Sequence, residues 1–316
     1  MDRLTVLRCS AYPAVAFEAL RAALPEHIVT CCDEAEVLAR AAEAQVLVPA
    51  RARINAAVLD AAPRCRLIQQ MGAGVDGVDL AEAARRGVPV ANVPASASGM
   101  AQAVAEMAVF HMVGLIRGYP SLASAVRAAD WQGAPISPSV WDRSVAVVGL
   151  GAIGRAIVAL LRPYGCRVLG LTRHPAEAQA LDLDWLGGLN DWPALLPQAD
   201  VLVLAVPLTP ETRGLVGAAE IAQLRRGSFI VNVSRGPVVD EAALLAALAS
   251  GQLAGAGLDV FWDEPADPAH PVFQHSVVVT PHVAGYTTSV LRRSGAVIAE
   301  NLRRLQAGEP ILHRVN

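Results

Sequence analysis

The stretch "VAVVGLGAIGRAIVALL", residues 145–161, constrains the fold of this chain more than any other feature. It joins an apolar run to a helical one through Gly149, Gly151 and Gly154, in the spacing G-x-G-x-x-G. In such a motif the first glycine permits a tight turn, the second lets the backbone approach a pyrophosphate, and the third lets helix and strand pack closely. The stretch predicts a parallel α/β unit that binds a dinucleotide; the alternative is a turn with a purely structural role.

The rest of the chain continues the same alternation of short apolar runs and Ala-rich helical stretches, which indicates an α/β fold with mostly parallel strands. A long apolar helix is expected over roughly residues 99–118, and a final helix over 287–308 with no strand after it. The runs expected to form strands before that first helix are "TVLRCS", "QVLVPA", "RLIQQM" and "VPVANV". Those expected after it are "VAVVGLG", "RVLGLT", "VLVLAV", "SFIVNVS", "AGAGLDV" and "VVVTP".

Composition narrows the class of protein. A length of 316 residues suits two domains, and 53% apolar residues provide enough material for their cores. The net charge of −3, without a basic block, argues against nucleic acid or an anionic membrane as partner. All 26 basic residues are arginine, which excludes a Schiff-base lysine and a P-loop lysine. The odd number of cysteines, five, and the absence of a signal sequence suggest reduced thiols and a cytoplasmic location.

Polar residues follow three of the expected strands in the second half of the chain. Arg235 comes after "IVNVS", Asp259 and then Glu264 after "AGAGL", and His282 after "VVVTP". The carboxyl ends of parallel strands form the ligand-binding edge of an open α/β sheet. Each residue taken singly could be an ordinary turn or core residue, but together they indicate a site.

Several stretches resemble the D-2-hydroxyacid dehydrogenase family, which includes phosphoglycerate dehydrogenases and glyoxylate/hydroxypyruvate reductases. The resemblance covers nearly the whole chain. It is carried by "VGLGAIGRAI", "LAVPLTPETRGLV", "IVNVSRGPVVDEAALLAALASGQLAGAGLDVFWDEP", "VVVTPHVAGYT" and, in the first half, "LIQQMGAGVDGVDLAEAARRGVPVANVPASASGMAQAVAEMAV".

The resemblance implies an NAD(P)-dependent oxidoreductase that reduces a small 2-keto acid, such as glyoxylate or hydroxypyruvate, to the D-2-hydroxy acid. Arg235 would bind the carboxylate and polarise the keto group, and His282 would act as the general acid in reduction. Glu264 would orient His282 and favour its imidazolium form. The substrate loop of the family maps onto Ala73, Gly74 and Val75, whose backbone N–H groups would bind the substrate carboxylate.

The cofactor contacts implied by the resemblance surround the glycine motif and follow the later strands; Asp259 matches the position that contacts the nicotinamide carboxamide. The full set is Gly149, Gly151, Ala152, Ile153, Gly154, Thr172, Arg173, His174, Val206, Pro207, Thr212, Val233, Ser234, Asp259 and Gly285.

The family pattern also implies the organisation of the chain: two Rossmann-like parallel-sheet domains with a cleft between them. Residues 1–98 and 286–316 would form a flavodoxin-like substrate-binding domain, and residues 99–285 the dinucleotide-binding domain. Homodimerisation through the latter domain is the habit of the family.

The stretch Thr172-Arg173-His174 predicts which cofactor is preferred. NAD-using members carry an aspartate at the position of Thr172, where it bonds the ribose 2′-OH. An aspartate would repel a 2′-phosphate, whereas Arg173 can pair with it bidentately. We therefore expect NADP(H) to be preferred, with NAD(H) possible; in the alternative, Arg173 stacks on the adenine or faces solvent.

Three other functions are alternatives to this interpretation of the sequence. One is a phosphoglycerate dehydrogenase-like enzyme of short form, since no further C-terminal domain is evident. A second is a non-catalytic, NAD(P)-sensing corepressor-like scaffold. Formate dehydrogenase shares the fold but carries a glutamine at the position of Glu264. No metal is expected, because the spacing of His270, His275 and His282 fits no metal-ligand pattern.

Overall fold

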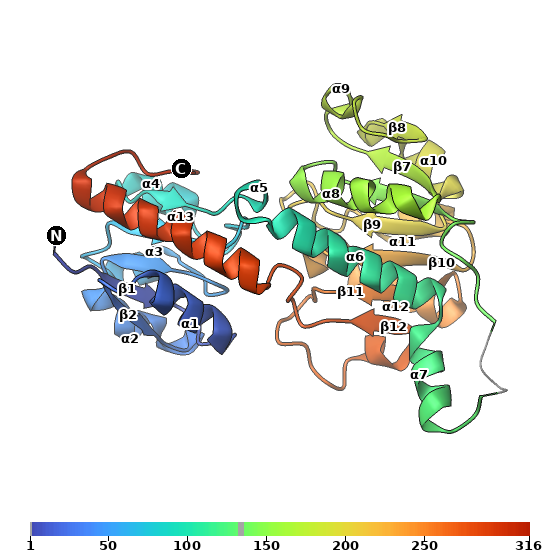
Figure 1. The fold of residues 1–316 in the computed structure, drawn as a ribbon, viewed down its shortest axis with the longest axis horizontal. Coiled ribbons are helices and arrows are strands. Elements are labelled where there is room, and N and C mark those ends of the chain that lie inside the picture. Colours follow the sequence, from blue (N-terminus) through green and yellow to red (C-terminus); the bar gives the residue numbers. More distant parts are fainter. Residues whose placement is uncertain (1, 132–135) are drawn as a thin grey trace. The chain divides into compact units, whose positions relative to one another are not determined.

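The computed structural model describes residues 2–131 and 136–316 (Figure 1). The chain divides into two compact units. The first unit comprises Met1–Met100 and Gly285–Asn316, and the second comprises Ala101–Ala284. The chain thus leaves the first unit and returns to it, close to the helix expected over 99–118 and just after His282.

The first unit is built on a parallel sheet with the strand order β2-β1-β3-β4-β5, the order of flavodoxin-like folds. Its strands are β1 (Thr5–Arg8), β2 (Ile28–Cys31), β3 (Val46–Val48), β4 (Leu67–Gln69) and β5 (Val90–Ala91). Its helices are α1 (Ala14–Ala23), α2 (Val37–Arg40), α3 (Ala56–Ala61), α4 (Leu80–Arg85), α5 (Ala95–Ser98) and α13 (Thr288–Ala307).

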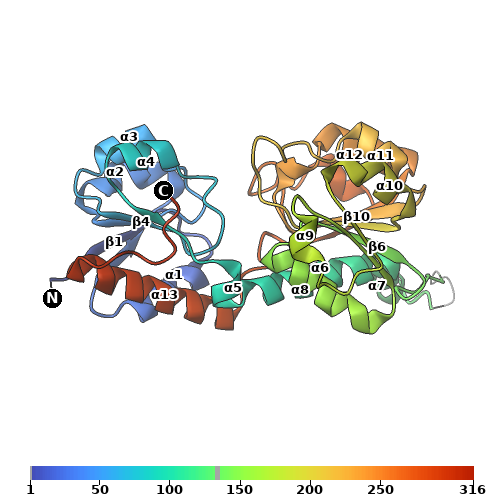
Figure 2. The same ribbon diagram turned by 90° about the horizontal axis from the view of Figure 1, so that it is seen from above.

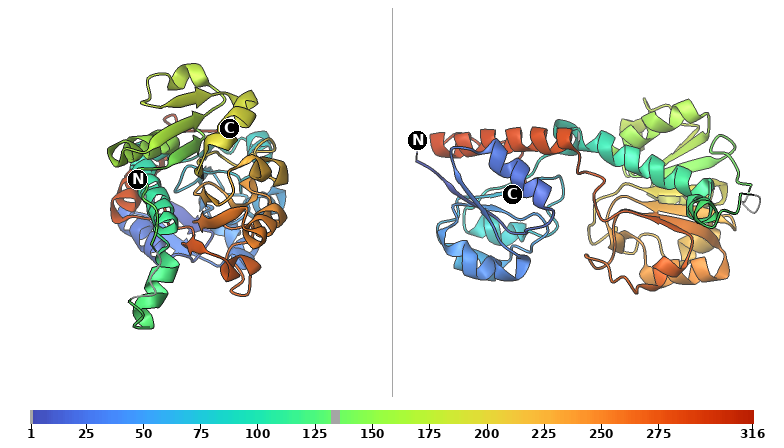
Figure 3. Two further views of the ribbon diagram at one scale, coloured as in Figure 1. Left: turned by 90° about the vertical axis from the view of Figure 1, so that its right-hand side faces the viewer. Right: turned by 60° about the horizontal axis from the view of Figure 1, so that its bottom comes forward.

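Helices cover both faces of this first sheet, as Figure 2 shows. Helices α2, α3 and α4 lie on one face, and α1 and α13 lie side by side on the other (Figure 3). Successive strand residues serve opposite cores: on β3, Leu47 belongs to the cluster beneath α2 to α4, and its neighbours Val46 and Val48 to the cluster beneath α1 and α13. Strands buried on both faces need apolar residues at every position, which explains why their sequences read as continuous apolar runs.

The second unit has a parallel sheet in the order β12-β11-β10-β9-β6-β7-β8, which is the Rossmann order extended by one strand. Its strands are β6 (Ser144–Val148), β7 (Arg167–Leu171), β8 (Trp185–Gly187), β9 (Val201–Leu204), β10 (Ser228–Asn232), β11 (Leu253–Leu258) and β12 (Val277–Val279). Its helices are α6 (Met100–Ile116), α7 (Tyr119–Arg127), α8 (Ala152–Leu161), α9 (Pro175–Ala178), α10 (Trp192–Leu195), α11 (Ala218–Gln223) and α12 (Glu241–Ser250).

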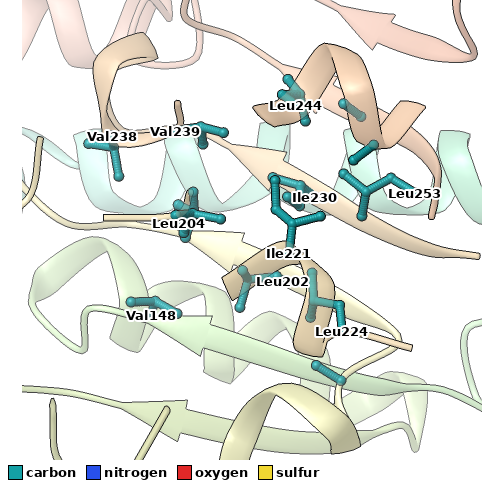
Figure 4. Packing of buried hydrophobic residues seen from close by; sticks show 14 of the residues in the cluster. Val148, Leu202, Leu204, Ile221, Leu224, Ile230, Val238, Val239, Leu244 and Leu253 are labelled. Carbon is teal, nitrogen blue, oxygen red and sulfur yellow. The ribbon is translucent and has the colours of Figure 1, made fainter. Parts of the chain in front are cut away.

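The second sheet is also covered on both faces. Helices α10, α11 and α12 lie on one face and α6 and α8 on the other (Figure 2). Beneath the first group, Leu202, Leu204 and Ile230 of the sheet pack against Ile221 and Leu244 (Figure 4). Because neighbouring strands of this sheet are parallel, the segments after β6, β9, β10, β11 and β12 emerge at the same edge of the sheet.

The predicted fold class, two Rossmann-like parallel-sheet units, is confirmed. Two strands, β2 and β8, were not expected from the sequence. Strand β8 has the sequence "WLG", and β2 the sequence "IVTC", of which no residue is fully buried; an edge strand needs no long apolar run. The segment after α13 was expected to contain no strand, and there Arg314 forms an isolated antiparallel bridge with Ala91. Among the described residues, no helix is long and apolar enough to cross a membrane.

Candidate active site

The glycine motif lies where the strand order reverses, between β6 and β9. Gly149 follows β6 with φ +91°, a conformation that L side chains rarely adopt, and a Cβ there would lie 2.7 Å from the Ala205 oxygen. A Cβ on Gly154 would overlap the carbonyl of Gly149, so α8 and β6 approach more closely than any side chain allows. A Cβ on Gly151 would meet nothing within 4 Å.

The opening of α8 therefore fits a pyrophosphate. Gly151 is the N-cap of this ten-residue helix, followed by Ala152 and Ile153 in its first turn. The free backbone N–H groups of a helix N-terminus and the helix dipole favour an anion. No protein atom would lie within 4 Å of a Cβ on Gly151, so the space beside this residue is open, as expected where the second glycine of the motif lets a pyrophosphate approach the backbone.

Thr172, Arg173 and His174 follow the end of β7. The Thr172 backbone N–H donates to the Gly187 oxygen at 3.1 Å, continuing the β7–β8 ladder, and Arg173 and His174 are exposed. The pKa of Glu211 is lowered, mainly by a hydrogen bond from Thr209 and more weakly by the positive charge of Arg173. A carboxylate from the segment after β9 thus lies within electrostatic reach of Arg173.

The segment after β9 runs beside the glycine motif. A Cβ on Gly149 would lie 2.7 Å from Cγ1 of Val206, which places Val206 against the first glycine. The Thr212 hydroxyl donates to the Pro207 oxygen at 2.6 Å and accepts from the Thr209 N–H at 2.7 Å. These two hydrogen bonds hold the loop of residues 207–212 together. Val206 and Pro207 therefore lie at the sheet edge next to an ordered turn.

Val233, Ser234 and Arg235 follow β10. Asn232 shapes this segment: its Oδ1 accepts from both the N–H and the hydroxyl of Ser234, and its Nδ2 donates to the Arg235 oxygen at 2.9 Å. The Arg235 guanidinium donates from Nη1 to the Ser234 oxygen at 2.8 Å. The next residue, Gly236, has no room for a Cβ against the Phe261 carbonyl. The backbone of Arg235 is therefore held by the Asn232 side chain, and its guanidinium is held by the carbonyl of Ser234.

Glu264 and His282 are in direct contact. His282 Nδ1 lies 2.7 Å from Glu264 Oε2, and the other carboxylate oxygen accepts from the Phe261 N–H at 3.0 Å. Their side chains are 31% and 19% exposed, so the pair is partly shielded but reachable by solvent. Because Nδ1 faces the carboxylate, Nε2 is the ring nitrogen that can exchange a proton with a substrate.

His282 also has an unusual backbone. Its φ is +55°, in the left-handed region that non-glycine residues seldom occupy, and its N–H donates to the Thr280 oxygen at 3.0 Å. Strained conformations of this kind persist where the surroundings hold them, and they concentrate at functional sites.

Asp259, expected to contact the cofactor, is buried and accepts hydrogen bonds from the protein itself. Its Oδ1 accepts from the Thr280 hydroxyl at 2.6 Å and the Val283 N–H at 3.0 Å, and its Oδ2 from the Ala284 N–H at 3.1 Å. Burial raises the pKa of this carboxyl, and the three hydrogen bonds partly oppose that rise. The carboxylate thereby holds the segment directly after His282.

The remaining expected contacts lie in the first unit. Ala73, Gly74 and Val75 form the loop after β4, where the Asn92 side chain donates to the Ala73 oxygen at 2.7 Å and the Val78 N–H to the Val75 oxygen at 2.9 Å. Gly285, expected among the cofactor contacts, begins the returning segment of this unit.

Four residues of this region were missed from the sequence. Asn232 and Thr280 precede the expected residues within the same strand ends, so their positions alone could have suggested them. Arg155 directly follows Gly154 in the glycine motif, and it donates to the Leu150 oxygen at 3.0 Å and to the Glu177 oxygen at 2.7 Å, joining the motif to α9. Glu211 comes from the segment after β9, and the charge of Arg173 contributes to the lowering of its pKa.

Comparison with known proteins identifies relatives along the chain. Residues 109–284 match the model of the D-isomer specific 2-hydroxyacid dehydrogenase family, NAD binding domain. The chain is 33% identical over 265 residues to the glyoxylate reductase of Korarchaeum cryptofilum, covering 81% of this chain and 77% of that protein. It is 36% identical over 287 residues to the D-3-phosphoglycerate dehydrogenase of Mycobacterium leprae, covering 90% of this chain but only 53%, about half, of that protein.

A solved structure shows the same relationship. The NADPH-dependent glyoxylate/hydroxypyruvate reductase of Sinorhizobium meliloti, crystallised with NADP and malonate, is 29% identical, with a TM-score of 0.84 over 99% of this chain and 97% of that one. The family model covers more than half of the sequence, and the glycine motif and strand-end residues lie within it. The chain therefore belongs to the D-isomer specific 2-hydroxyacid dehydrogenase family.

Proposed function

We propose that this protein reduces a small 2-keto acid, of the glyoxylate or hydroxypyruvate type, to the D-2-hydroxy acid with a nicotinamide dinucleotide as cofactor. The observation that carries the proposal is the His282–Glu264 contact at 2.7 Å in the unit that also holds the glycine motif. A dinucleotide at α8 would supply the hydride. A proton donor is then needed for the oxygen that becomes the hydroxyl, and the His282–Glu264 pair can provide it.

The contacts of these side chains support the following proposed roles. Glu264 accepts from Nδ1 of His282 and fixes the ring, so that Nε2 delivers the proton to the substrate oxygen in reduction and removes it in oxidation. The guanidinium of Arg235 offers a planar fork for the substrate carboxylate and stabilises negative charge on the keto oxygen. We assign the backbone N–H groups of Ala73, Gly74 and Val75 to the same carboxylate.

In this proposal the second unit, with Gly149, Gly151 and Gly154, is the dinucleotide-binding domain. The first unit is the substrate-binding domain. The strand orders support this, because the Rossmann order belongs to the second unit and the flavodoxin-like order to the first.

We also propose that NADP(H) is preferred over NAD(H). Thr172 occupies the place of the aspartate that would repel a 2′-phosphate, and the exposed Arg173 beside it can bind that phosphate. The relative from Sinorhizobium meliloti, with its bound NADP, is consistent with this preference. Glu211 works against it, because its negative charge lies within reach of Arg173.

We propose, further, that two copies associate through the second unit. Exposed apolar side chains follow one another along α6, α7 and the segment before β6: Phe110, Tyr119, Val126, Trp131 and Trp141. Val126, Trp131 and Trp141 are 61%, 77% and 69% exposed. Single exposed apolar residues are ordinary, but a run of large ones on adjoining elements is typical of an interface.

A second candidate function is the oxidation of a phosphorylated 2-hydroxy acid. It is favoured by the relatives named D-3-phosphoglycerate dehydrogenase, and Arg51, whose guanidinium lies 5.9 Å from the Tyr12 ring, offers a cation in the first unit. A phosphate on the substrate would need such a cation.

The experiment that tests these proposals is an initial-rate assay of glyoxylate and hydroxypyruvate reduction, with NADPH and NADH side by side, and of 3-phosphoglycerate oxidation with NADP and NAD. We expect turnover of an unphosphorylated keto acid, faster with NADPH. Faster turnover of 3-phosphoglycerate would favour the second candidate. Tight dinucleotide binding with no turnover of any of these acids would contradict the proposed reaction and favour a sensing scaffold.

A further inference from the structure

His111 is a histidine in the apolar interior of the second unit. It lies on α6 and is fully buried, among neighbours such as Ala108, Met112 and Leu115. Gly257 of β11 makes room for it, because a Cβ there would lie 2.7 Å from the Cβ of His111. A polar ring in such a place is costly unless it is hydrogen-bonded. Its presence therefore calls for a reason other than packing.

The ring forms the first link of a hydrogen-bond chain. His111 Nε2 lies 3.0 Å from the Thr280 hydroxyl, which lies 2.6 Å from Asp259 Oδ1. A hydroxyl has a single proton. Because a carboxylate only accepts, Thr280 gives its proton to Asp259 and must accept from His111. The proton of the ring is thus on Nε2. Nδ1 is buried with no hydrogen-bond partner among the described residues.

Burial keeps this ring neutral. Desolvation lowers the pKa of His111 to about 4. At neutral pH the ring therefore carries one proton. In the chain His111–Thr280–Asp259 each group then donates to the next, in the direction of Asp259.

The far end of the chain holds the turn at His282. Asp259 accepts from the N–H groups of Val283 and Ala284, directly after His282, and Thr280 accepts on its carbonyl oxygen from the N–H of His282 itself. The backbone on one side of His282, whose φ is +55°, is therefore held by the Asp259 side chain, and on the other side by the backbone carbonyl of Thr280. A left-handed backbone at a residue other than glycine costs free energy, which the hydrogen bonds around it can offset.

We propose that His111 and Thr280 are positioning residues for the reaction: the Nε2–H of His111 fixes the hydroxyl of Thr280 on Asp259, and Asp259 thereby holds His282 in the left-handed turn that faces it toward Glu264. This inference rests on the proposed function. Neither side chain touches the reacting atoms in this arrangement. Both act through the backbone of residues 282–284.

The loss of either link has a defined consequence. Without the Nε2 donor, the Thr280 hydroxyl can rotate away from Asp259. The carboxylate then loses one of its three donors, and the turn that carries His282 gains freedom. The proton-transfer geometry is degraded while the glycine motif, which lies on other strands, is untouched. The expected signature is therefore a lower kcat with little change in dinucleotide affinity.

Two matched pairs of variants test this. His111→Leu removes the donor, whereas His111→Gln places an amide N–H near the position of Nε2. Thr280→Val removes the hydroxyl at constant size, whereas Thr280→Ser retains it. We expect His111→Leu and Thr280→Val to lower kcat by about 3- to 10-fold, the range of one neutral hydrogen bond. His111→Gln and Thr280→Ser should restore most of the rate. Equal rates in His111→Leu and wild type would overturn the proposal.

The double variant separates a chain from two independent effects. If His111 acts through Thr280, His111→Leu combined with Thr280→Val should be no slower than Thr280→Val alone. If the fold-losses in kcat of the two single variants multiply in the double variant, the two residues act independently, which would contradict the proposal. The midpoint of thermal unfolding, measured for every variant, identifies a loss of rate that comes from unfolding. A kcat loss that His111→Gln does not rescue, in a stably folded protein, would also count against the proposal.

A spectroscopic measurement tests the chain independently of activity. ¹⁵N–¹H correlation spectra of the labelled wild-type protein at pH 7, with His111→Gln for assignment, report the tautomer of His111. We expect a proton on Nε2 and a bare Nδ1; a proton on Nδ1 would reverse the chain and overturn the inference. If the wild type turned over no keto acid but showed this tautomer, the proposed function would fail while the chain stood. An active wild type with the opposite tautomer would refute the chain alone.

Discussion

At the scale of single residues, His282 is the most constrained part of the candidate site. Its position after a strand, together with the polar residues after two other strands, predicted a functional role. Neither its φ of +55° nor its 2.7 Å contact with Glu264 can be inferred from the local sequence. Eighteen residues separate the two along the chain. Only the parallel pairing of β11 with β12 brings their segments to the same edge of the sheet.

Replacement of His282 by alanine should remove the proton donor. We expect kcat for keto-acid reduction to fall by about 10²- to 10⁴-fold, the usual contribution of general acid catalysis, with the Kd for NADPH nearly unchanged. Glu264→Gln keeps a hydrogen-bonding side chain but removes the charge, so its loss should be smaller. Steady-state kinetics and fluorescence titration of NADPH check both. Undiminished turnover in His282→Ala would exclude it as the acid.

The residues after β7 carry the prediction on cofactor choice. In the double variant Thr172→Asp, Arg173→Ala, the ratio of kcat/KM for NADPH to that for NADH should fall by about 10- to 100-fold, the value of a charged hydrogen bond. Glu211→Gln should raise that ratio, because it removes the negative charge near Arg173. Arg167→Ala, at the exposed start of β7, is the control. An unchanged ratio in the double variant would mean that Arg173 does not read the phosphate.

At the scale of elements, the glycine motif shows why three identical residues have three different tasks. Gly149 is required by its φ, Gly154 by the carbonyl of Gly149 against it, and Gly151 by neither, since its φ of −73° is ordinary and its surroundings are open. Gly149 and Gly154 are therefore needed for the chain to fold. Gly151, with open space at the N-terminus of α8, is needed for binding.

This difference predicts opposite behaviour for two substitutions. Gly154→Ala should lower the midpoint of thermal unfolding by several degrees or prevent folding, because the added methyl group overlaps backbone rather than a movable side chain. Gly151→Ala should leave that midpoint nearly unchanged and weaken NADPH binding by about 10-fold or more, if one phosphate hydrogen bond is lost. Equal affinity in Gly151→Ala and wild type would place the pyrophosphate elsewhere.

The buried His111 of α6 predicts a dependence of stability on pH. Its pKa of about 4 in the folded protein lies below the ordinary value of 6.5, because burial disfavours the charged ring. As the pH falls, the unfolded chain therefore binds a proton at this histidine before the folded protein does. The stability it contributes is complete above pH 6.5 and is lost as the pH falls toward 4. At pH 5 this amounts to about 2 kcal/mol relative to pH 8.

His111→Leu should abolish this part of the acid sensitivity. Urea unfolding of wild type and variant at pH 5 and pH 8 measures it: the wild type should lose more stability on acidification than the variant. His27→Leu is a suitable control, since the pKa of His27 is also lowered but its side chain is only partly buried. Parallel losses in wild type and His111→Leu would show that His111 does not titrate on unfolding.

At the scale of the whole molecule, the chain forms two units of different strand order, each with its own double-sided core. The first unit is assembled from both ends of the chain: α13, the last helix, packs against α1, where Gly295 allows close contact with Ala23. The contiguous second unit carries the glycine motif, Arg235, Glu264 and His282.

The exposed apolar side chains of Phe110, Tyr119, Val126, Trp131 and Trp141 predict that the protein forms a dimer. Light scattering with size-exclusion chromatography should give twice the mass of the 33.0 kDa chain at micromolar concentration. The double variant Val126→Glu, Trp141→Glu should shift the protein toward the monomer while its circular dichroism is retained, because a buried charge without a partner opposes association. A monomeric wild type would contradict the proposal that this surface binds a second copy of the chain.

The sequence by itself determined the parallel α/β class, the glycine turn and the strand-end residues, because each is a local signal: apolar runs buried on both faces, a fixed glycine spacing, and polar residues where strands end. The short edge strands β2 and β8 escaped because weakly buried strands need no distinctive sequence. The tertiary structure alone decided the contacts between distant segments. It placed Glu264 beside His282 and His111 beside Thr280, 169 residues away. Such contacts depend on strand order and helix packing, which no local pattern encodes.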